Sequence, residues 1–229
     1  MTDNTINPAG FNQAATMPNL SPEQMAKIKE AQAKKSEAIK KVKEMLEKTQ
    51  KECEPFKKEI LKKFKKEILA ITLLPPTGKE KQLDVFIVLK LEGDIDEKFK
   101  KKNEIDKIII ELGKKKLKDL KVVTALHDEI WDMALKGKHD FISTLAMSAS
   151  IYDNNFLGPL RAVVIHKKMV LEKFEKYVVS YVLSGSVTRG EATEESDIDT
   201  FIIIDDTDVT RMTGHELKSR LRGIIWGMA

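Results

Sequence analysis

The chain repeats one segment of its own sequence, and this repeat constrains the fold more than any other feature. Residues 57–76 align with residues 167–186. Six of the first ten aligned pairs are identical: Lys57/Lys167, Lys58/Lys168, Leu61/Leu171, Lys63/Lys173, Phe64/Phe174 and Lys66/Lys176. After a gap of five residues in the next loop, residues 82–87 align with residues 197–202. Such self-similarity is typical of one structural unit used twice.

Hydrophobic patterning predicts the same order of elements in both copies, which is helix, strand, loop and strand. In the first copy we expect a helix over 56–68, strands over 69–74 and 83–89, a helix over 95–118 and a third strand over 120–126. Three more helices are expected near 129–136, 139–150 and 157–177. The second copy then follows, with strands over 178–183 and 198–204 and a helix from about residue 211. This order predicts an α/β protein.

A long helix is expected before the first copy. Ser21-Pro22-Glu23-Gln24 is a typical helix start, and Pro55 should end that helix near Glu54 because proline lacks the backbone donor. A partial heptad stripe runs along it, comprising Met25, Ile28, Ile39, Val42, Leu46 and Cys53. Polar residues fill the three other positions of the stripe, Gln32, Lys35 and Thr49. This stripe, which we call the 25–53 seam, indicates that the helix packs against a partner, either a second copy of the chain or the body of the protein.

Lysine is frequent in the helices at 26–54 and 96–118. These lysines could bind the phosphates of a nucleic acid. Interleaved glutamates and the scarcity of aromatic side chains for stacking favour the alternative, a solvated helix surface.

One motif carries the candidate chemistry. Gly185-Ser186 follows a strand, and Asp197-Ile198-Asp199 comes after ten intervening residues, at the start of the next strand. Successive side chains on a strand point to opposite faces, so two aspartates separated by one residue share a face, with Cα atoms about 6–7 Å apart. Paired carboxylates bind hard cations, and a glycine lets the backbone approach a phosphate closely. A serine at the start of a helical turn suits an anion.

This Gly-Ser and Asp-x-Asp pattern resembles the DNA polymerase β nucleotidyltransferase superfamily, in particular its minimal archaeal and bacterial members. The resemblance implies two tandem palm units behind a helical arm. It implies that Asp197 and Asp199 are catalytic and ligate two Mg²⁺ ions, with Mn²⁺ as an alternative, and that Gly185 and Ser186 contact the triphosphate. Arg189 and Gly190 match the turn that often follows, and Arg189 is a further candidate phosphate contact.

The implied reaction is transfer of a nucleoside monophosphate from an NTP to a hydroxyl. The motif does not identify the acceptor or the base, since fold alone does not determine either.

The chain departs from the family pattern in two respects. The family normally supplies a third carboxylate on a later strand, whereas this sequence reaches Ala229 within an expected helix, so we expect the second unit to be incomplete. In the first copy, Pro75-Pro76 replaces Gly-Ser, Gln82 replaces the first aspartate, and the strand at 122–126 has no acid. We therefore expect the first copy to be inactive. The alternative for the whole chain is a non-enzymatic protein that binds a nucleotide, RNA or a partner.

The predicted organisation is a disordered tail at 1–20, a helical arm at 21–54, a degenerate unit at 55–155 and the motif-bearing unit at 156–229. Cys53 is the single cysteine, so no intramolecular disulfide can form. No apolar run approaches the ~18 residues that span a bilayer, and the first residues do not resemble a signal peptide. These features predict a cytoplasmic protein with no membrane partner.

Overall fold

The structure is a computed structural model that describes residues 22–75, 84–117, 121–205, 213–216, 218–219 and 222. Two compact units share the chain, Met1–Lys48 and Thr49–Ala229. The predicted disordered tail at 1–20 lies outside the described residues, as does most of the helix expected after residue 211. Both copies of the repeat fall within the second unit.

Helix α1 spans Pro22–Phe64, with Pro55 in its interior. The prediction that this helix ends near Glu54 is wrong. A proline inside a helix costs about 3 kcal/mol because it removes one hydrogen bond and crowds the preceding turn. Cys53, Phe56 and Ile60 are fully buried on either side of it, and each such side chain contributes roughly 1.5–3 kcal/mol. Tertiary packing therefore outweighs the local preference of Pro55.

A four-stranded mixed sheet forms the centre of the second unit. Its strands are β1 (Ile68–Leu74), β2 (Asp84–Leu89), β3 (Lys121–Leu126) and β4 (Ala149–Asp153), in the order β3-β2-β1-β4. Strands β2 and β3 are parallel, and the other neighbours are antiparallel. The predicted strands are confirmed to within one residue at their starts, and the sheet has the mixed α/β character expected of a nucleotidyltransferase fold.

Strand β4 contradicts the prediction of a helix that continues to residue 150. The helix there, α4 (His139–Ala146), ends earlier. The strand is held by distant partners, because Thr72 Oγ1 donates to the Ala149 carbonyl at 2.9 Å and Gln50 Nε2 donates to the Ser150 carbonyl at 2.9 Å. A strand of five residues with this dependence on long-range pairing has little signal of its own in the sequence.

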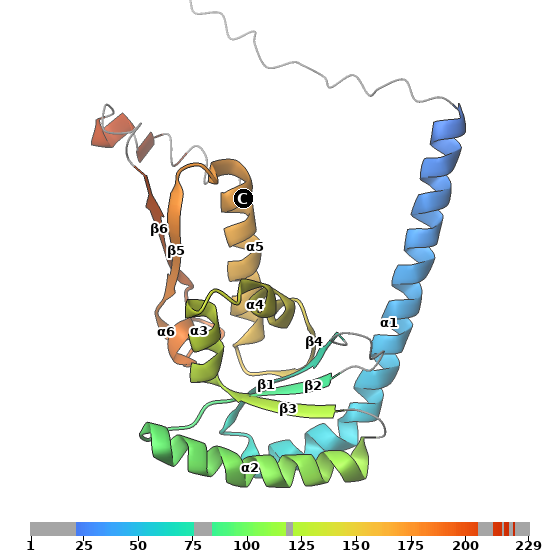
Figure 1. Ribbon diagram of the computed structural model, residues 1–229, viewed down its shortest axis with the longest axis vertical. Helices are drawn as coiled ribbons and strands as arrows, with labels where there is room; N and C mark the ends of the chain where they lie inside the picture. Colours follow the sequence, from blue (N-terminus) through green and yellow to red (C-terminus); the bar gives the residue numbers. More distant parts are fainter. Residues whose placement is uncertain are drawn as a thin grey trace, which may run out of the picture. The chain divides into compact units, whose positions relative to one another are not determined.

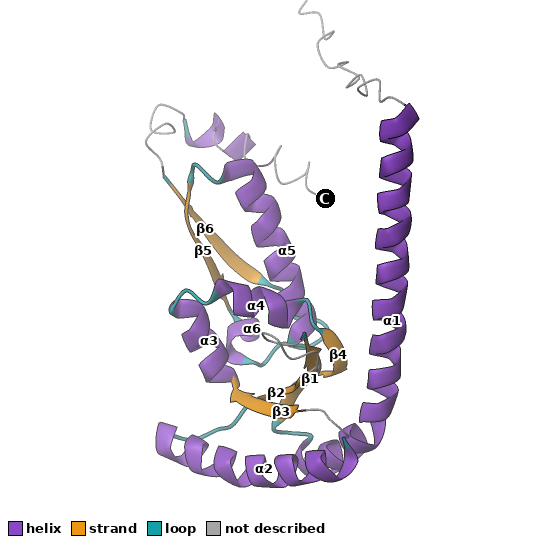
Figure 2. Cartoon of the chain, turned by 45° about the vertical axis from the view of Figure 1, so that its right-hand side comes forward, coloured by secondary structure: helices purple, strands orange, loops and turns teal. Residues whose placement is uncertain are grey.

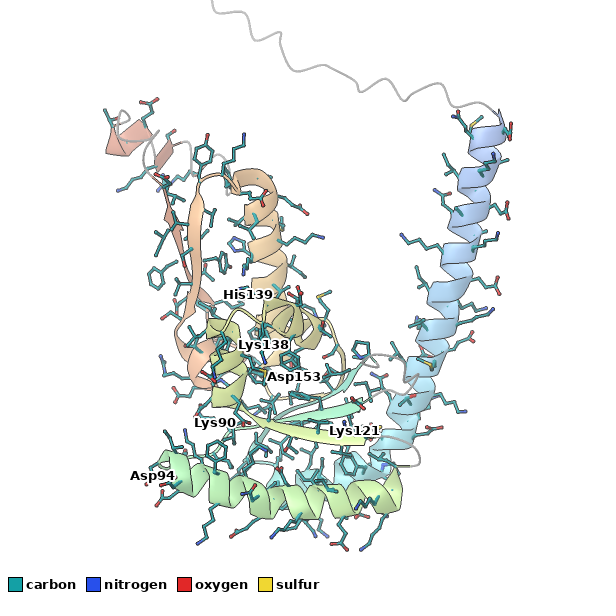
Figure 3. The ribbon with its side chains drawn as sticks, in the orientation of Figure 1. Lys90, Asp94, Lys121, Lys138, His139 and Asp153 are labelled. Carbon is teal, nitrogen blue, oxygen red and sulfur yellow. The ribbon has the colours of Figure 1, made fainter. Side chains whose placement is uncertain are left out.

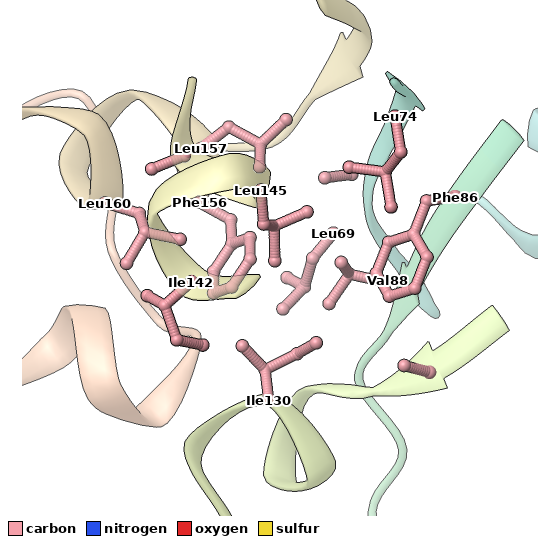
Figure 4. Packing of buried hydrophobic residues seen from close by; sticks show 13 residues of the cluster. Leu69, Leu74, Phe86, Val88, Ile130, Ile142, Leu145, Phe156, Leu157 and Leu160 are labelled. Atoms are coloured by element: carbon pink, nitrogen blue, oxygen red, sulfur yellow. The ribbon is translucent and has the colours of Figure 1, made fainter. Parts of the chain in front are cut away.

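Helices cover both faces of this sheet (Figure 1). The end of α1 and helix α2 (Ile95–Lys116) lie on one side, joined by an ion pair of 2.8 Å between Lys116 and Glu59. Helices α3 (His127–Leu135), α4 and α5 (Leu157–Phe174) lie on the other side. Figure 4 shows the apolar core that they form with β1 and β2, which includes Leu69, Phe86, Val88, Ile130, Ile142, Leu145, Phe156 and Leu160.

A second, two-stranded sheet carries the motif. It consists of β5 (Val178–Ser184) and β6 (Asp199–Ile204), connected through the short helix α6 (Ser186–Arg189). Helix α5 runs beside this hairpin (Figure 2), and a hydrogen bond of 2.8 Å between His166 Nδ1 and Tyr181 Oη joins α5 to β5. Asp153, labelled in Figure 3, starts α5 by accepting from the backbone amides of residues 156–158.

The local geometry of residues 64–90 recurs in residues 174–205. Each β-hairpin has one irregular step in its register, between Ile68 and Ala70 in the first and between Val178 and Ser180 in the second. The hydrogen bond from Lys90 N to the Glu67 carbonyl (2.8 Å) has its counterpart between Asp205 N and the Tyr177 carbonyl (2.7 Å). The two hairpins therefore share the same strand register, the same irregular step and the same closing hydrogen bond. The residues that correspond in the two structures are the ones that the sequence alignment pairs.

None of the described helices combines the length and the apolar content that crossing a membrane requires.

Candidate active site

Gly185 forms the bend between β5 and α6. Its backbone has φ 79° and ψ −152°, a conformation that only glycine adopts without strain. The β5–β6 ladder ends at the pair Ser184 and Asp199, which places Asp199 beside this bend. A Cβ at Gly185 would lie 3.1 Å from Cγ of Asp199 and closer still to its Oδ2. The absent side chain of Gly185 therefore makes room for the carboxylate of Asp199.

Asp197 lies outside the strand on which it was expected. Strand β6 begins at Asp199, and residues 196–198 are irregular because β5 turns away at Gly185 and offers no partner beyond Ser184. Alternation of side chains along β6 therefore determines the direction of the Asp199 side chain but not that of Asp197. Asp197 is exposed two residues earlier, between α6 and β6.

The short helix α6 is held by its own hydrogen bonds. Thr188 Oγ1 donates to the Gly185 carbonyl at 2.9 Å, and the Ser186 carbonyl accepts from the amide of Glu191 at 2.9 Å. Ser186 is half-buried at the first position after the bend. Gly185 lies against Asp199, and Ser186 follows it directly as the first residue of α6.

Arg189 and Gly190 lie at the opposite end of α6. Arg189 is exposed, and its Nε donates to Glu191 Oε2 at 2.8 Å. This hydrogen bond, with the charges of Lys90 and Arg189, lowers the pKa of Glu191. Gly190 ends α6 in a left-handed conformation with φ 64°. A phosphate would have to compete with Glu191 for Arg189.

The face of the second sheet that carries Asp199 is open. Phe201 and Ile203 share that face by strand alternation, and they are 61% and 52% exposed. In the first sheet the aligned residues, Phe86 and Val88, are 4% and 0% exposed. The ring of Phe86 packs edge-on against Phe141 of α4 at 5.7 Å. Helix packing thus buries this face of the first sheet, whereas the corresponding residues of the second sheet are exposed.

The described residues contain no group of three or more His, Cys, Asp or Glu side chains arranged to hold a metal ion. Two carboxylates can still suffice for Mg²⁺, since this ion is commonly held by one or two carboxylates, substrate phosphates and water. Oxygen donors are the type that Mg²⁺ prefers, so Asp197 and Asp199 fit the ion by chemistry.

In the first copy, Asp84 pairs with Leu74 at the position that corresponds to Asp199, whereas Gln82 lies outside the described residues.

Two residues near the turn were not found by sequence reasoning. His127, at the start of α3, lies beside Gly190, where a Cβ would meet its Nε2 at 3.2 Å, and Lys90, after β2, donates to the Gly190 carbonyl at 3.3 Å. Lys90 and Gly190 are 100 positions apart in the chain. No motif links them, so only the tertiary structure brings them together.

Comparison with known proteins agrees with this geometry. Residues 164–224 match the family described as "Nucleotidyltransferase domain", and the match covers most of α5 and all of β5, α6 and β6. No curated protein and no solved structure matches the chain. The match is consistent with a polymerase β-like nucleotidyltransferase, a class that acts on nucleoside triphosphates and transfers a nucleoside monophosphate.

Proposed function

We propose that this chain is a metal-dependent nucleotidyltransferase that transfers a nucleoside monophosphate from an NTP to a hydroxyl and releases pyrophosphate. The observation that carries the proposal is the contact between the Asp199 carboxylate and Gly185, at the end of a two-stranded ladder within the matched domain. This contact places an acid next to a bend whose backbone can approach a polyphosphate.

Asp197 and Asp199 would hold the divalent cations. When bound, Mg²⁺ neutralises charge on the triphosphate and on the developing pyrophosphate. Both aspartates are exposed, so they are accessible to an incoming metal–nucleotide complex. Asp199 is further oriented by the ladder and by its contact with Gly185.

Gly185 and Ser186 would bind the triphosphate. Gly185 lacks the Cβ that would separate a phosphate from the backbone, and Ser186 adds a hydroxyl. Arg189 becomes a phosphate contact if an anion displaces Glu191 from it, and Gly190 would act through the shape of the turn rather than by direct contact.

The test compares nucleotide binding by paired variants. Asp197→Asn with Asp199→Asn removes both proposed metal ligands, while Glu194→Gln with Glu195→Gln removes two exposed acids of the same loop. We expect the aspartate pair to weaken Mg²⁺- or Mn²⁺-dependent NTP binding by at least about tenfold, because the loss of a charge-assisted contact costs 1.5–3 kcal/mol or more. Isothermal titration measures this. Equal affinities for wild type and the aspartate variant would refute the metal assignment.

We also propose that residues 55–155, the first copy of the repeat, are an inactive version of the same unit. The shared register of the two hairpins and the burial of the Phe86 face support this, as does the lack of an acid in β3. One buried cysteine, Cys53, is compatible with a reducing compartment such as the cytoplasm.

A second candidate function is binding of RNA or of another copy through α1, without catalysis. Met25, Ile28, Ile39 and Val42 are 42–59% exposed on the seam, and lysines surround them. Because Thr49 begins the second compact unit, a deletion of residues 1–48 is the appropriate variant for testing this arm.

For RNA, the measurement is a gel shift at increasing salt, comparing the full chain with the chain lacking residues 1–48. If the arm binds phosphates, deletion should weaken binding by about tenfold or more and flatten its salt dependence. Unchanged binding would exclude the arm as the RNA contact.

A further inference from the structure

The end of the motif turn that points away from Asp199 is held by the first copy of the repeat. Val187, the second residue of α6, is only 1% exposed, although Arg189 two positions later is exposed. A Cβ at Gly190 would lie 3.1 Å from Cδ1 of Leu69 and 3.2 Å from Nε2 of His127. Gly190 therefore allows the turn to pack directly against β1 and the start of α3.

His127 provides the buried polar part of this contact. The indole Nε1 of Trp131 donates to Nε2 of His127 at 2.9 Å. An indole can only donate, so Nε2 must be the acceptor, and the neutral ring carries its proton on Nδ1. Asp128 Oδ1 lies 3.5 Å from that nitrogen, and the Nε2–Cδ2 edge of the ring faces Gly190 of the turn. Burial lowers the pKa of His127, which favours this neutral form.

The ring of His127 is also held in place by its neighbours. Trp131 and Phe156 contact it edge-on, with ring centroids at 5.8 Å and 5.6 Å, and the two contact one another at 6.4 Å. The side chain of His127 is 4% exposed. A ring this restricted presents one fixed edge, Nε2–Cδ2, to Gly190 of the turn.

Lys90 makes a second contact at the outer edge. Its Nζ lies 3.3 Å from the Gly190 carbonyl and 3.5 Å from Glu191 Oε1. Lys90 follows β2 directly and is labelled in Figure 3. A cation at the last carbonyls of a helical turn is electrostatically favourable.

These contacts matter because α6 has only four residues. A helix of that length is not stable by itself, so its conformation depends on what holds it. The end at Val187–Glu191 is bound to the first copy, and the other end, at Gly185, contacts Asp199. Fixing one end of so short an element fixes the other.

We propose that His127 and Lys90 are positioning residues for the second copy, and that the inactive copy holds the phosphate-binding turn in place beside Asp199. The effect on nucleotide binding rests on the proposed function, because residues 55–155 would stabilise the nucleotide site of the other copy. His127 acts through its packing against Gly190 and Lys90 through the Gly190 carbonyl, and neither contacts the nucleotide.

The test uses hydrogen exchange and nucleotide binding on the full chain. The amides of Gly190 and Glu191 donate within the turn at 3.2 Å and 2.9 Å, so their exchange reports on its order. His127→Ala should accelerate their exchange at least about tenfold while β1 and β2 remain protected. His127→Gln, which restores part of the side-chain volume beside Gly190, should restore part of the protection. His166→Ala is the matched control, because it removes a histidine from the α5–β5 contact instead.

The same variants are then titrated with each of the four common NTPs in the presence of Mg²⁺. We expect His127→Ala to weaken the tightest of them at least about tenfold and His166→Ala to change it less than about twofold. If His127→Ala does not fold, Lys90→Met serves in its place, since Lys90 is partly exposed, with an expected acceleration of at least about threefold.

The outcomes separate this inference from the proposed function. Unchanged exchange at Gly190 and Glu191 in a folded His127→Ala protein refutes the positioning role. Faster exchange with unchanged NTP affinity refutes it as well, because the turn would then move without consequence. Faster exchange in a protein whose wild type binds no NTP supports the anchoring contact and refutes the proposed nucleotidyltransferase function.

Discussion

At the scale of single residues, the proposed site centres on one glycine, Gly185, and one carboxylate, that of Asp199. Gly185 combines a backbone conformation that favours glycine with a contact that leaves no room for a Cβ. The backbone conformation and the contact are two separate reasons for a glycine at this position. Substitutions can distinguish them, because another glycine of the chain has a positive φ but no close neighbour. Gly137 has φ 78°, and a Cβ there would meet nothing within 4 Å.

Gly185→Ala and Gly137→Ala should therefore differ sharply. Each substitution adds backbone strain of about 1 kcal/mol or more, but only Gly185→Ala displaces the Asp199 carboxylate. We expect Mg²⁺-dependent NTP affinity to fall at least about tenfold in Gly185→Ala and to stay within about twofold in Gly137→Ala, with similar losses of thermal stability. Titration and thermal unfolding measure the two effects. Equal affinities would show that the contact with Asp199 does not matter.

At the scale of elements, α1 has two parts with different surroundings. Cys53, Phe56 and Ile60 are buried in the second unit, whereas the seam residues from Met25 to Val42 are exposed. The sequence prediction left open whether the seam contacts another copy or the body of the protein. The buried residues show that the later part of the helix packs in the body, and self-association of the earlier part stays a prediction.

That prediction can be tested with charges placed on and off the seam. Ile39→Lys with Val42→Lys places two charges in the seam, while Ala26→Lys with Ala33→Lys adds the same charge away from it. If two copies pair through this stripe, the first variant should raise the dimer dissociation constant by at least about tenfold, since burying an unpaired charge is costly. Analytical ultracentrifugation measures it. A monomeric wild type, or equal effects of both variants, would contradict the pairing.

At the scale of the whole molecule, the second compact unit includes the last turns of α1 as well as both copies of the repeat. Its core needs Cys53, Phe56 and Ile60, all fully buried. The boundary at Thr49 therefore separates an arm from a body, and the boundary that Pro55 suggested would cut through the packed part of the helix.

Two truncations should have opposite outcomes for this reason. A chain that begins at Thr49 should keep the fold, with its Tm changed by less than about 4 °C, corresponding to ~1 kcal/mol. A chain that begins at Leu61 loses three buried side chains worth roughly 5–9 kcal/mol, which is comparable with the whole stability of a domain, and should not fold. Circular dichroism during heating distinguishes them. Loss of structure in the longer chain would show that residues 22–48 belong to the core.

The sequence by itself determined what depends on neighbours along the chain. The alternation of apolar residues predicts the strands around 69–74, 84–89 and 178–183, and the small residues Gly185-Ser186 with Asp199 identify the turn and its acid. The repeat predicts that both hairpins have the same order of elements. Such patterns are local because a helix or a strand repeats every few residues.

Only the tertiary structure decided the rest, and the physical reason is the same in each case. Pro55 stays inside a helix because Phe56 and Ile60 are buried, β4 exists because β1 offers it an edge, and Gly190 packs against His127 and Lys90, which are distant in the chain. Each outcome depends on the free energy of contacts between residues distant in sequence. No local pattern encodes those contacts, so they appear only once the chain is folded.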